Sequence, residues 1–247
     1  MLNRSLQFAN RAGGRYAWCR LTNFVPPLYS FLNDEEWAII ESWYDETEKE
    51  QLLGECNVAF MSVLQGFVMG SAISNIIQLG HFAGYSTLLL GFMLRRMKKK
   101  HSLMTVDISE HCCNYTQMWI DRAGLGDYVR VELGDSANAT MVEKALKLFG
   151  ASPRLVLIDS SHQFEQTLHE LRLWYPSVER GGFIFLHDSG PYAKSFDSTN
   201  KGGVSRAMEE WLVSYRDARA INIYPPEDSY AKPIYMDPCG IGIIQKG

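Results

Sequence analysis

Short apolar runs alternate with amphipathic segments from about residue 75 to the end of the chain. The segment at 110–123 is typical, because its apolar residues recur at three- and four-residue spacing, as on a helix with one buried face. The apolar runs lie at 76–79, 103–106, 128–133, 155–158, 183–186, 220–224 and 241–245, and the helical segments at 85–98, 110–123, 138–149, 164–175 and 204–215. Continuously apolar strands that alternate with helices indicate a parallel sheet covered on both faces. We therefore predict an α/β fold with a doubly wound, mostly parallel, seven-stranded sheet.

The first 72 residues differ from the rest. Two helices are predicted at 35–48 and 55–72, ahead of the sheet. No acidic residue precedes Asp34, whereas four arginines do (Arg4, Arg11, Arg15 and Arg20). A transit peptide is Arg-rich and acid-poor, but the aromatic residues around Pro26 and Pro27 favour an arm that packs on the domain or on a neighbouring subunit. We therefore divide the chain into an N-terminal arm with helices, 1–72, and an α/β domain, 73–247, and we expect a homo-oligomer.

Composition limits the class of protein. With 46% hydrophobic and 12% aromatic residues, the chain can fill a substantial core. A net charge of −4 provides no strong field for nucleic acid or an anionic membrane, and no apolar run reaches the roughly 20 residues of a membrane span. The five cysteines are odd in number and show no C-x-x-C spacing, which is typical of a reducing compartment. We expect a cytoplasmic protein with no nucleic-acid partner and no membrane span.

The residues just after the strands carry the candidate chemistry, because ligands of open α/β sheets bind beyond the carboxyl ends of the strands. The first run is followed by "LGHFAGYST", in which Gly80 and Gly84 allow a tight turn before a helix begins. A dinucleotide fingerprint would need glycines where Phe82 and Tyr85 stand. This loop therefore favours an anion smaller than a pyrophosphate, such as a carboxylate.

The next two strands end in further polar residues. Asp107 follows the second run and can accept the hydroxyls of a ribose. In "LGDS", after the third run, Asp135 and Ser136 can contact an adenine amino group. Each of these residues alone is also common in ordinary turns, but together they describe a carboxylate–ribose–adenine ligand, the outline of S-adenosylmethionine. The candidate cofactor-binding residues are Gly80, His81, Gly84, Tyr85, Ser86, Asp107, Asp135 and Ser136.

Residues 76–188 resemble class I S-adenosylmethionine-dependent methyltransferases. They are most similar to small-molecule O-methyltransferases of the catechol type and of the cephalosporin-hydroxylase and macrocin-like group. The matching motifs are "LGHFAGYST", "VDIS", "LGDS" and "VLIDSSHQFEQTLHELRLWYPSVERGGFIFLHD". The last is the most specific, because a strand, D-x-x-H, a helix, G-G, a strand and H-D recur in that order. The resemblance covers somewhat under half the chain and departs from the family at Gln78, where an acidic residue is usual.

The resemblance also implies an active site. In catechol-type enzymes an Asp after the fourth strand and an acidic/amide pair after the fifth hold a divalent cation, and a general base lies three residues past the first ligand. This assigns Asp159, His187 and Asp188 as metal ligands and His162, with Asp159, as catalytic. Oxygen ligands suit magnesium, our first expectation. A histidine with two carboxylates would instead suit iron, manganese or zinc.

Several alternatives remain open from the sequence. His162 also suits a helix cap, and His187 a structural histidine. We expect an S-adenosylmethionine-dependent, metal-assisted O-methyltransferase acting on a small hydroxylated molecule, with 189–203 as a substrate loop or lid. A metal-independent methyltransferase, a cofactor-binding protein that has lost its chemistry, and a non-heme iron oxygenase are the competing hypotheses.

Overall fold

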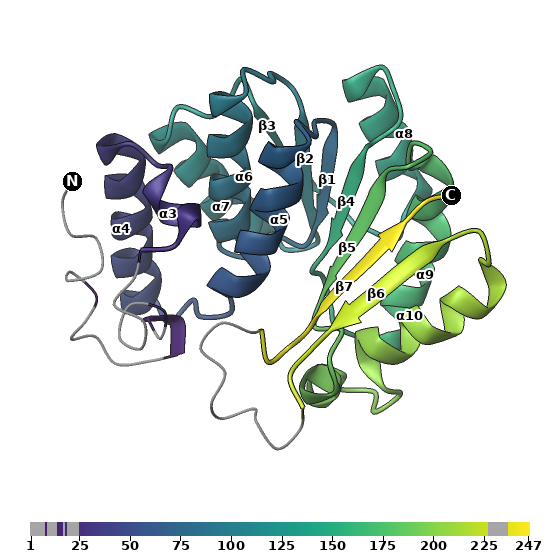
Figure 1. Ribbon diagram of the computed structural model, residues 1–247. Helices are drawn as coiled ribbons and strands as arrows, with labels where there is room; N and C mark the ends of the chain where they lie inside the picture. The colour runs from purple at the N-terminus through teal and green to yellow at the C-terminus, as the bar shows by residue number, and fades with distance from the viewer. Residues whose placement is uncertain (1–7, 9–13, 17, 19–24, 227–236) are drawn as a thin grey trace.

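The computed structural model has one seven-stranded sheet with helices on both faces (Figure 1). It describes residues 8, 14–16, 18, 25–226 and 237–247. The strand order is β3-β2-β1-β4-β5-β7-β6, and β7 runs opposite to the other six strands of this sheet. The strands are β1 (Ile76–Leu79), β2 (Leu103–Asp107), β3 (Val129–Leu133), β4 (Leu155–Ile158), β5 (Phe183–His187), β6 (Arg219–Ile223) and β7 (Ile241–Gln245). The predicted doubly wound fold is confirmed.

Two hydrophobic clusters lie on the two faces of the sheet. In β4, Leu155 and Leu157 belong to one cluster, and Val156 and Ile158 to the other, because successive side chains of a strand point to opposite faces. The first face is covered by α4 (Asp34–Lys49), α5 (Val58–Gly70), α6 (Tyr85–Arg96) and α7 (Glu110–Arg122). The short α3 (Pro27–Ser30) and η1 (Gly14–Tyr16) pack in the same hydrophobic cluster. The second is covered by α8 (Ala139–Phe149), α9 (Phe164–Trp174) and α10 (Gly203–Ser214), and η2 (Tyr175–Ser177) continues α9. Both layers are buried, which explains the continuously apolar strands.

Side-chain caps decide where the N-terminal helices begin. Asn33 accepts a hydrogen bond from the Glu36 N–H at 2.8 Å, and the Glu36 carboxylate accepts one from the Asn33 N–H at 2.9 Å. The Asn57 side chain accepts from the Phe60 N–H at 3.1 Å, so α5 begins at Val58 rather than at the predicted residue 55. Residues 50–57 are left to form a loop, which reaches the carboxyl ends of the strands.

The described part of the N-terminal arm packs on the chain's own domain. Phe8 and Tyr16 are fully buried and contact the ring of Tyr44 at centroid distances of 5.3 and 5.5 Å. Arg15 forms an ion pair of 2.6 Å with Glu55. The other three arginines of the arm lie outside the described residues. Packing against a second subunit, and the division of the chain after residue 72, stay predictions.

The segment 189–203, the predicted substrate loop or lid, has local order of its own. It contains the 3₁₀ helix η3 (Pro191–Phe196). The buried carboxylate of Asp197 then accepts hydrogen bonds from the N–H groups of Thr199, Lys201 and Gly203. These bonds fix the turn into α10.

No helix among the described residues is long and apolar enough to cross a bilayer.

Candidate functional site

A cavity of about 490 Å³ opens at the carboxyl ends of β1 to β4. This volume lies within the range of small-molecule sites. Of the predicted site residues, all but three contribute to its wall; the exceptions are Gly84, His187 and Asp188. Predicted site residues that follow the four strands β1 to β4 therefore meet at one cavity.

Gly80 and Gly84 shape the loop after β1, but their close contacts are with the protein. Both adopt positive φ, +82° and +87°, which favours glycine. A Cβ on Gly80 would lie 2.0 Å from the Asp159 carbonyl oxygen, and one on Gly84 would lie 2.9 Å from the Thr116 hydroxyl. The glycines let the loop pack between the end of β4 and α7, and α6, whose first two residues line the cavity, then begins at Tyr85.

Asp107 joins this loop to the end of β2. One carboxylate oxygen accepts from the backbone N–H groups of His81 and Phe82, both at 3.1 Å, and the other accepts from the Ser109 N–H at 2.9 Å. Since a carboxylate has about four acceptor positions, about one remains for a ligand. Asp107 thus both orders the loop and can accept one further hydroxyl.

His81 contributes a neutral imidazole. Its Nδ1 lies 2.9 Å from the Thr105 hydroxyl, and its Nε2 is buried without a partner among the described residues. Burial lowers the pKa of His81 to about 4, although the charge of Asp107 acts in the opposite direction. The ring therefore cannot pair with an anion as a cation, and its backbone N–H is the part that orders the loop.

Gln78 takes the position where the family usually has an acidic residue. Its amide nitrogen donates to the Gly80 carbonyl at 3.0 Å and to the Ser86 hydroxyl at 2.7 Å, and its oxygen accepts from the Thr87 hydroxyl at 3.0 Å. All these partners belong to the loop after β1 or the start of α6. Gln78 therefore ties the loop after β1 to the start of α6.

A buried acid supports the opposite side of the cavity. Glu170, on α9, accepts hydrogen bonds from the hydroxyls of Ser136 and Ser160, which both line the cavity. Burial raises the pKa of Glu170 to about 7, and the hydrogen bonds from Ser136, Ser160 and Gln166 offset only part of that effect. Asp135 is exposed beside Ser136 and accepts from Gln166 at 3.2 Å. The predicted adenine-contacting pair therefore lies on a polar network that the sequence did not indicate.

Asp159, at the end of β4, lies among histidines. His187 Nδ1 lies 3.2 Å from Asp159 Oδ1 and 3.2 Å from Asp188 Oδ2, and His187 Nε2 lies 3.0 Å from Asp237 Oδ2. Burial disfavours the imidazolium, but the charges of Asp188 and its neighbours outweigh burial and raise the pKa of His187 well above its usual value. His187 is thus a buried base surrounded by carboxylates.

His162 and Asp188 form a close pair at the open side of this group. His162 Nδ1 lies 2.7 Å from Asp188 Oδ2, and the His162 side chain is 34% exposed, so a ligand can reach it. Burial lowers the pKa of His162, but the hydrogen bond to Asp188 and the charges of Asp188 and Asp159 outweigh burial and raise it. Both residues have φ of +58°, a sparsely populated region that is common at functional sites.

The donor atoms around Asp159 fit a divalent cation. Two overlapping groups have their ligand atoms within 4.8 Å of one another: Cys56, Asp159 and His187, and Asp159, His162 and Asp188. Magnesium binds mainly through oxygen, whereas imidazole and thiolate ligands are typical of transition ions. The set therefore suits a transition ion better than the magnesium that we expected.

Sequence reasoning missed part of the wall. Exposed apolar side chains line the cavity at Leu53, Phe82 and Ile108, with exposed fractions of 52%, 37% and 77%. A flat apolar group such as a nucleobase would cover them. Cys56 and Asp237 come from loops without periodicity, so no sequence signal indicated them.

Known proteins support the same reading of the fold. Residues 77–189 match the family model of a methyltransferase domain. The chain has a methyltransferase domain. This match confirms the predicted enzyme class, and the methyltransferase domain contains every predicted site residue, while Cys56 and Asp237 lie outside it. No curated protein matches the chain.

Three solved structures share the fold of this methyltransferase over most of its length. An O-methyltransferase from Bacillus cereus, in complex with SAH, is 16% identical and covers 85% of this chain and 91% of its own, with a TM-score of 0.66. The SAH-bound methyltransferase PaMTH1 from Podospora anserina is 13% identical, covers 87% and 89%, and has a TM-score of 0.64. The O-methyltransferase TomG from Streptomyces achromogenes, involved in tomaymycin synthesis and in complex with SAM, is 14% identical, covers 96% and 100%, and has a TM-score of 0.59. At these identities the likeness concerns the fold.

Proposed function

We propose that this methyltransferase transfers the methyl group of S-adenosylmethionine to a hydroxyl of a small molecule, with the help of a divalent cation. One observation carries the proposal: the cavity is lined by the Asp107 carboxylate at one strand end and by His162, which Asp188 contacts from behind the cavity wall, beyond another strand end. The first suits a ribose hydroxyl, and the second suits removal of a proton from the acceptor. The SAH- and SAM-bound structures of the same fold support this choice of cofactor.

His162 is the proposed general base. With Nδ1 directed at Asp188, His162 has Nε2 left to accept the acceptor's hydroxyl proton. The raised pKa of His162 favours that transfer. Asp188 positions the ring, as the carboxylate of a catalytic triad positions its histidine.

The cation is proposed to bind Asp159, His187 and Asp188. When bound, it would lower the pKa of the acceptor hydroxyl. The acceptor is proposed to rest near the exposed ring of Phe196, which lies 6.0 Å from the His162 ring between centroids. Trp174 and Trp211 are buried in the core and do not contact it.

Turnover of S-adenosylmethionine with a panel of hydroxylated small molecules tests the function. We expect a methyl ether product, and His162→Ala to lower the rate about 10²–10⁴-fold at neutral pH. The loss should shrink at high pH, where the acceptor ionises unaided. His169→Ala, which alters an exposed histidine on α9, is the matched control. Full activity with a chelator present would remove the cation from the proposal, and a normal rate for His162→Ala would make His162 a structural residue.

A further inference from the structure

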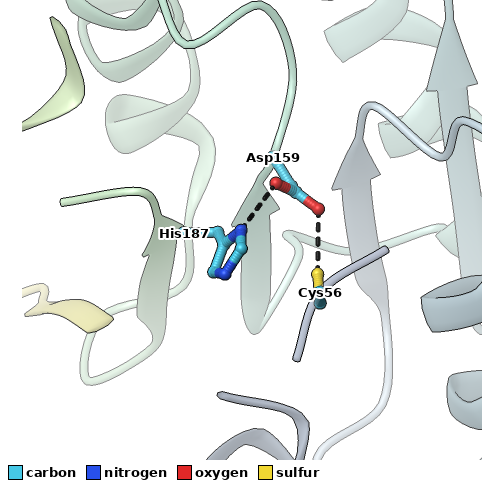
Figure 2. Close-up of side chains that lie close together, drawn as sticks. All are labelled: Cys56, Asp159 and His187. Atoms are coloured by element: carbon cyan, nitrogen blue, oxygen red, sulfur yellow. Dashed lines mark hydrogen bonds and ion pairs between the residues drawn. The ribbon is translucent and has the colours of Figure 1, made fainter. Parts of the chain in front are cut away.

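A thiol contacts the carboxylate at the centre of the site. Figure 2 shows Cys56 and His187 directed at the two oxygens of Asp159 from different elements. The Cys56 thiol donates to Oδ2 at 2.9 Å, and His187 Nδ1 lies 3.2 Å from Oδ1. Cys56 belongs to the loop between α4 and α5, and its side chain is buried. The oxygen ligands that the family resemblance implies are thus joined here by a sulfur donor.

Two contacts away from Asp159 fix the orientation of the His187 ring. Its Nε2 lies 3.0 Å from Asp237 Oδ2, and Phe60 packs edge-on against the ring at 4.7 Å between centroids. Metal-binding histidines usually donate their second N–H to a carboxylate in this way, which orients the ligating nitrogen. Here that nitrogen is Nδ1, which faces Asp159.

We propose that Cys56 is a ligand of the cation and that Cys56, Asp159 and His187 together select a thiophilic divalent ion such as zinc over magnesium. The inference rests on the proposed function, which places a cation at Asp159. Thiolate and imidazole ligands suit zinc, whereas magnesium dehydrates reluctantly and prefers an octahedron of oxygens.

The distances allow this ligand set. In a tetrahedral zinc site with bonds of 2.0–2.3 Å, ligand atoms lie about 3.3–3.8 Å apart. Cys56 Sγ and His187 Nδ1 lie 2.9 and 3.2 Å from the two different oxygens of Asp159, and one ligand atom from each of the three residues lies within 4.8 Å of the others, so shifts of about 1 Å convert the group to that geometry. On binding, the Cys56 thiol releases its proton to the solvent, and the sulfur donates an electron pair to the ion. Asp188, the third ligand of the proposed function, would take the fourth position, and catalytic zinc sites can expand to five ligands when a substrate oxygen binds.

Cobalt(II), a spectroscopic substitute for zinc, provides the test. The full chain, stripped with a chelator, is titrated with cobalt, and we expect one equivalent to bind with a near-ultraviolet sulfur-to-cobalt charge-transfer band. Cys56→Ser should lose the band, whereas Cys112→Ser, which alters a thiol in the same cavity at the start of α7, should keep it. Magnesium in roughly thousand-fold excess should not displace the cobalt.

A second variant keeps the test decisive if Cys56→Ser folds poorly. Cys56→Asp should bind cobalt without the band and should bind magnesium more tightly than the wild type does. Bound cobalt with no sulfur band in the wild type, an unchanged band in Cys56→Ser, or ready displacement by magnesium would overturn the inference and leave the cation site standing. A wild type that binds no cobalt but still binds SAH would refute both the inference and the cation in the proposed function, and leave the cofactor site standing.

Discussion

Glu170→Gln should make the protein's stability less dependent on pH. Glu170 is fully buried, and its pKa of about 7 exceeds the model-peptide value of 4.5. Between these two values the folded chain binds more protons than the unfolded chain, so stability falls as pH rises. The stabilisation of the folded state that Glu170 contributes is fully present below about pH 4.5 and is lost as pH rises through about 7.

The size of the effect follows from the shift of about 2.5 units. At 1.36 kcal/mol per unit, ionising Glu170 in the folded state costs about 3 kcal/mol. For a chain of this length, that corresponds to a change of about 6–12 °C in melting temperature. Glutamine keeps the shape of the side chain and can bond to both serine hydroxyls, accepting from one and donating to the other, but it cannot ionise, so the variant should lose this part of the pH dependence.

Differential scanning calorimetry between pH 5 and pH 8.5 measures the effect. The melting temperature of the wild type should fall, relative to that of Glu170→Gln, by about 5–10 °C across this range, because part of the contribution is already lost at pH 5. Glu165→Gln, which alters an exposed glutamate on the same helix, should follow the wild type. Parallel curves of melting temperature against pH for wild type and Glu170→Gln would contradict the raised pKa, because they would mean that Glu170 ionises alike in the folded and unfolded chain.

Two further predictions concern the walls of the cavity. Gly80→Ala should destabilise the fold by more than about 2 kcal/mol in denaturant titrations, because it adds a clash at 2.0 Å to the strain of positive φ, whereas Gly66→Ala, on an exposed site in α5, should not destabilise it. A loss below about 0.5 kcal/mol for Gly80→Ala would contradict this reading of the loop. Ile108→Ala should leave stability unchanged but weaken SAH binding about fivefold, about 1 kcal/mol, while Val213→Ala, equally exposed on α10, should do neither. Equal SAH affinities for the two variants would remove Ile108 from the ligand's contacts.

The elements of the sheet could be predicted from the sequence because the local pattern and the tertiary packing agree. The predicted bounds of β1, β4 and β7 are the observed ones, since each apolar run is buried on both faces. The predicted start of α5, residue 55, was wrong by three residues. The side chain of Asn57 caps the helix, so α5 begins at Val58. The order within 189–203 was not foreseen, because it depends on the carboxylate of Asp197, which organises the backbone of the segment.

The site was only partly predictable. Residues at successive strand ends meet because parallel strands end at one edge, which brought Asp107 and Asp159 to the same cavity. Cys56 lies 103 residues from its partner Asp159, and Asp237 lies 50 residues from His187. Such contacts depend on how loops cross the sheet's edge, and neither periodicity nor spacing encodes them. The role of Glu170 could not be predicted for another reason: residue type alone does not show whether an acid on a helix is buried or exposed.

Isothermal titration calorimetry of SAH with the wild type and with Asp107→Ala tests the central claim most directly. We expect one SAH site per chain in the wild type and a loss of about 1.5–3 kcal/mol in binding free energy in the variant, the range for a hydrogen bond to a charged group. Thermal unfolding of the variant verifies that it is folded, because Asp107 also holds three backbone N–H groups. A wild type that binds no SAH would remove the cofactor from the proposed function, and a folded Asp107→Ala that binds SAH with unchanged affinity would remove Asp107 from the cofactor site.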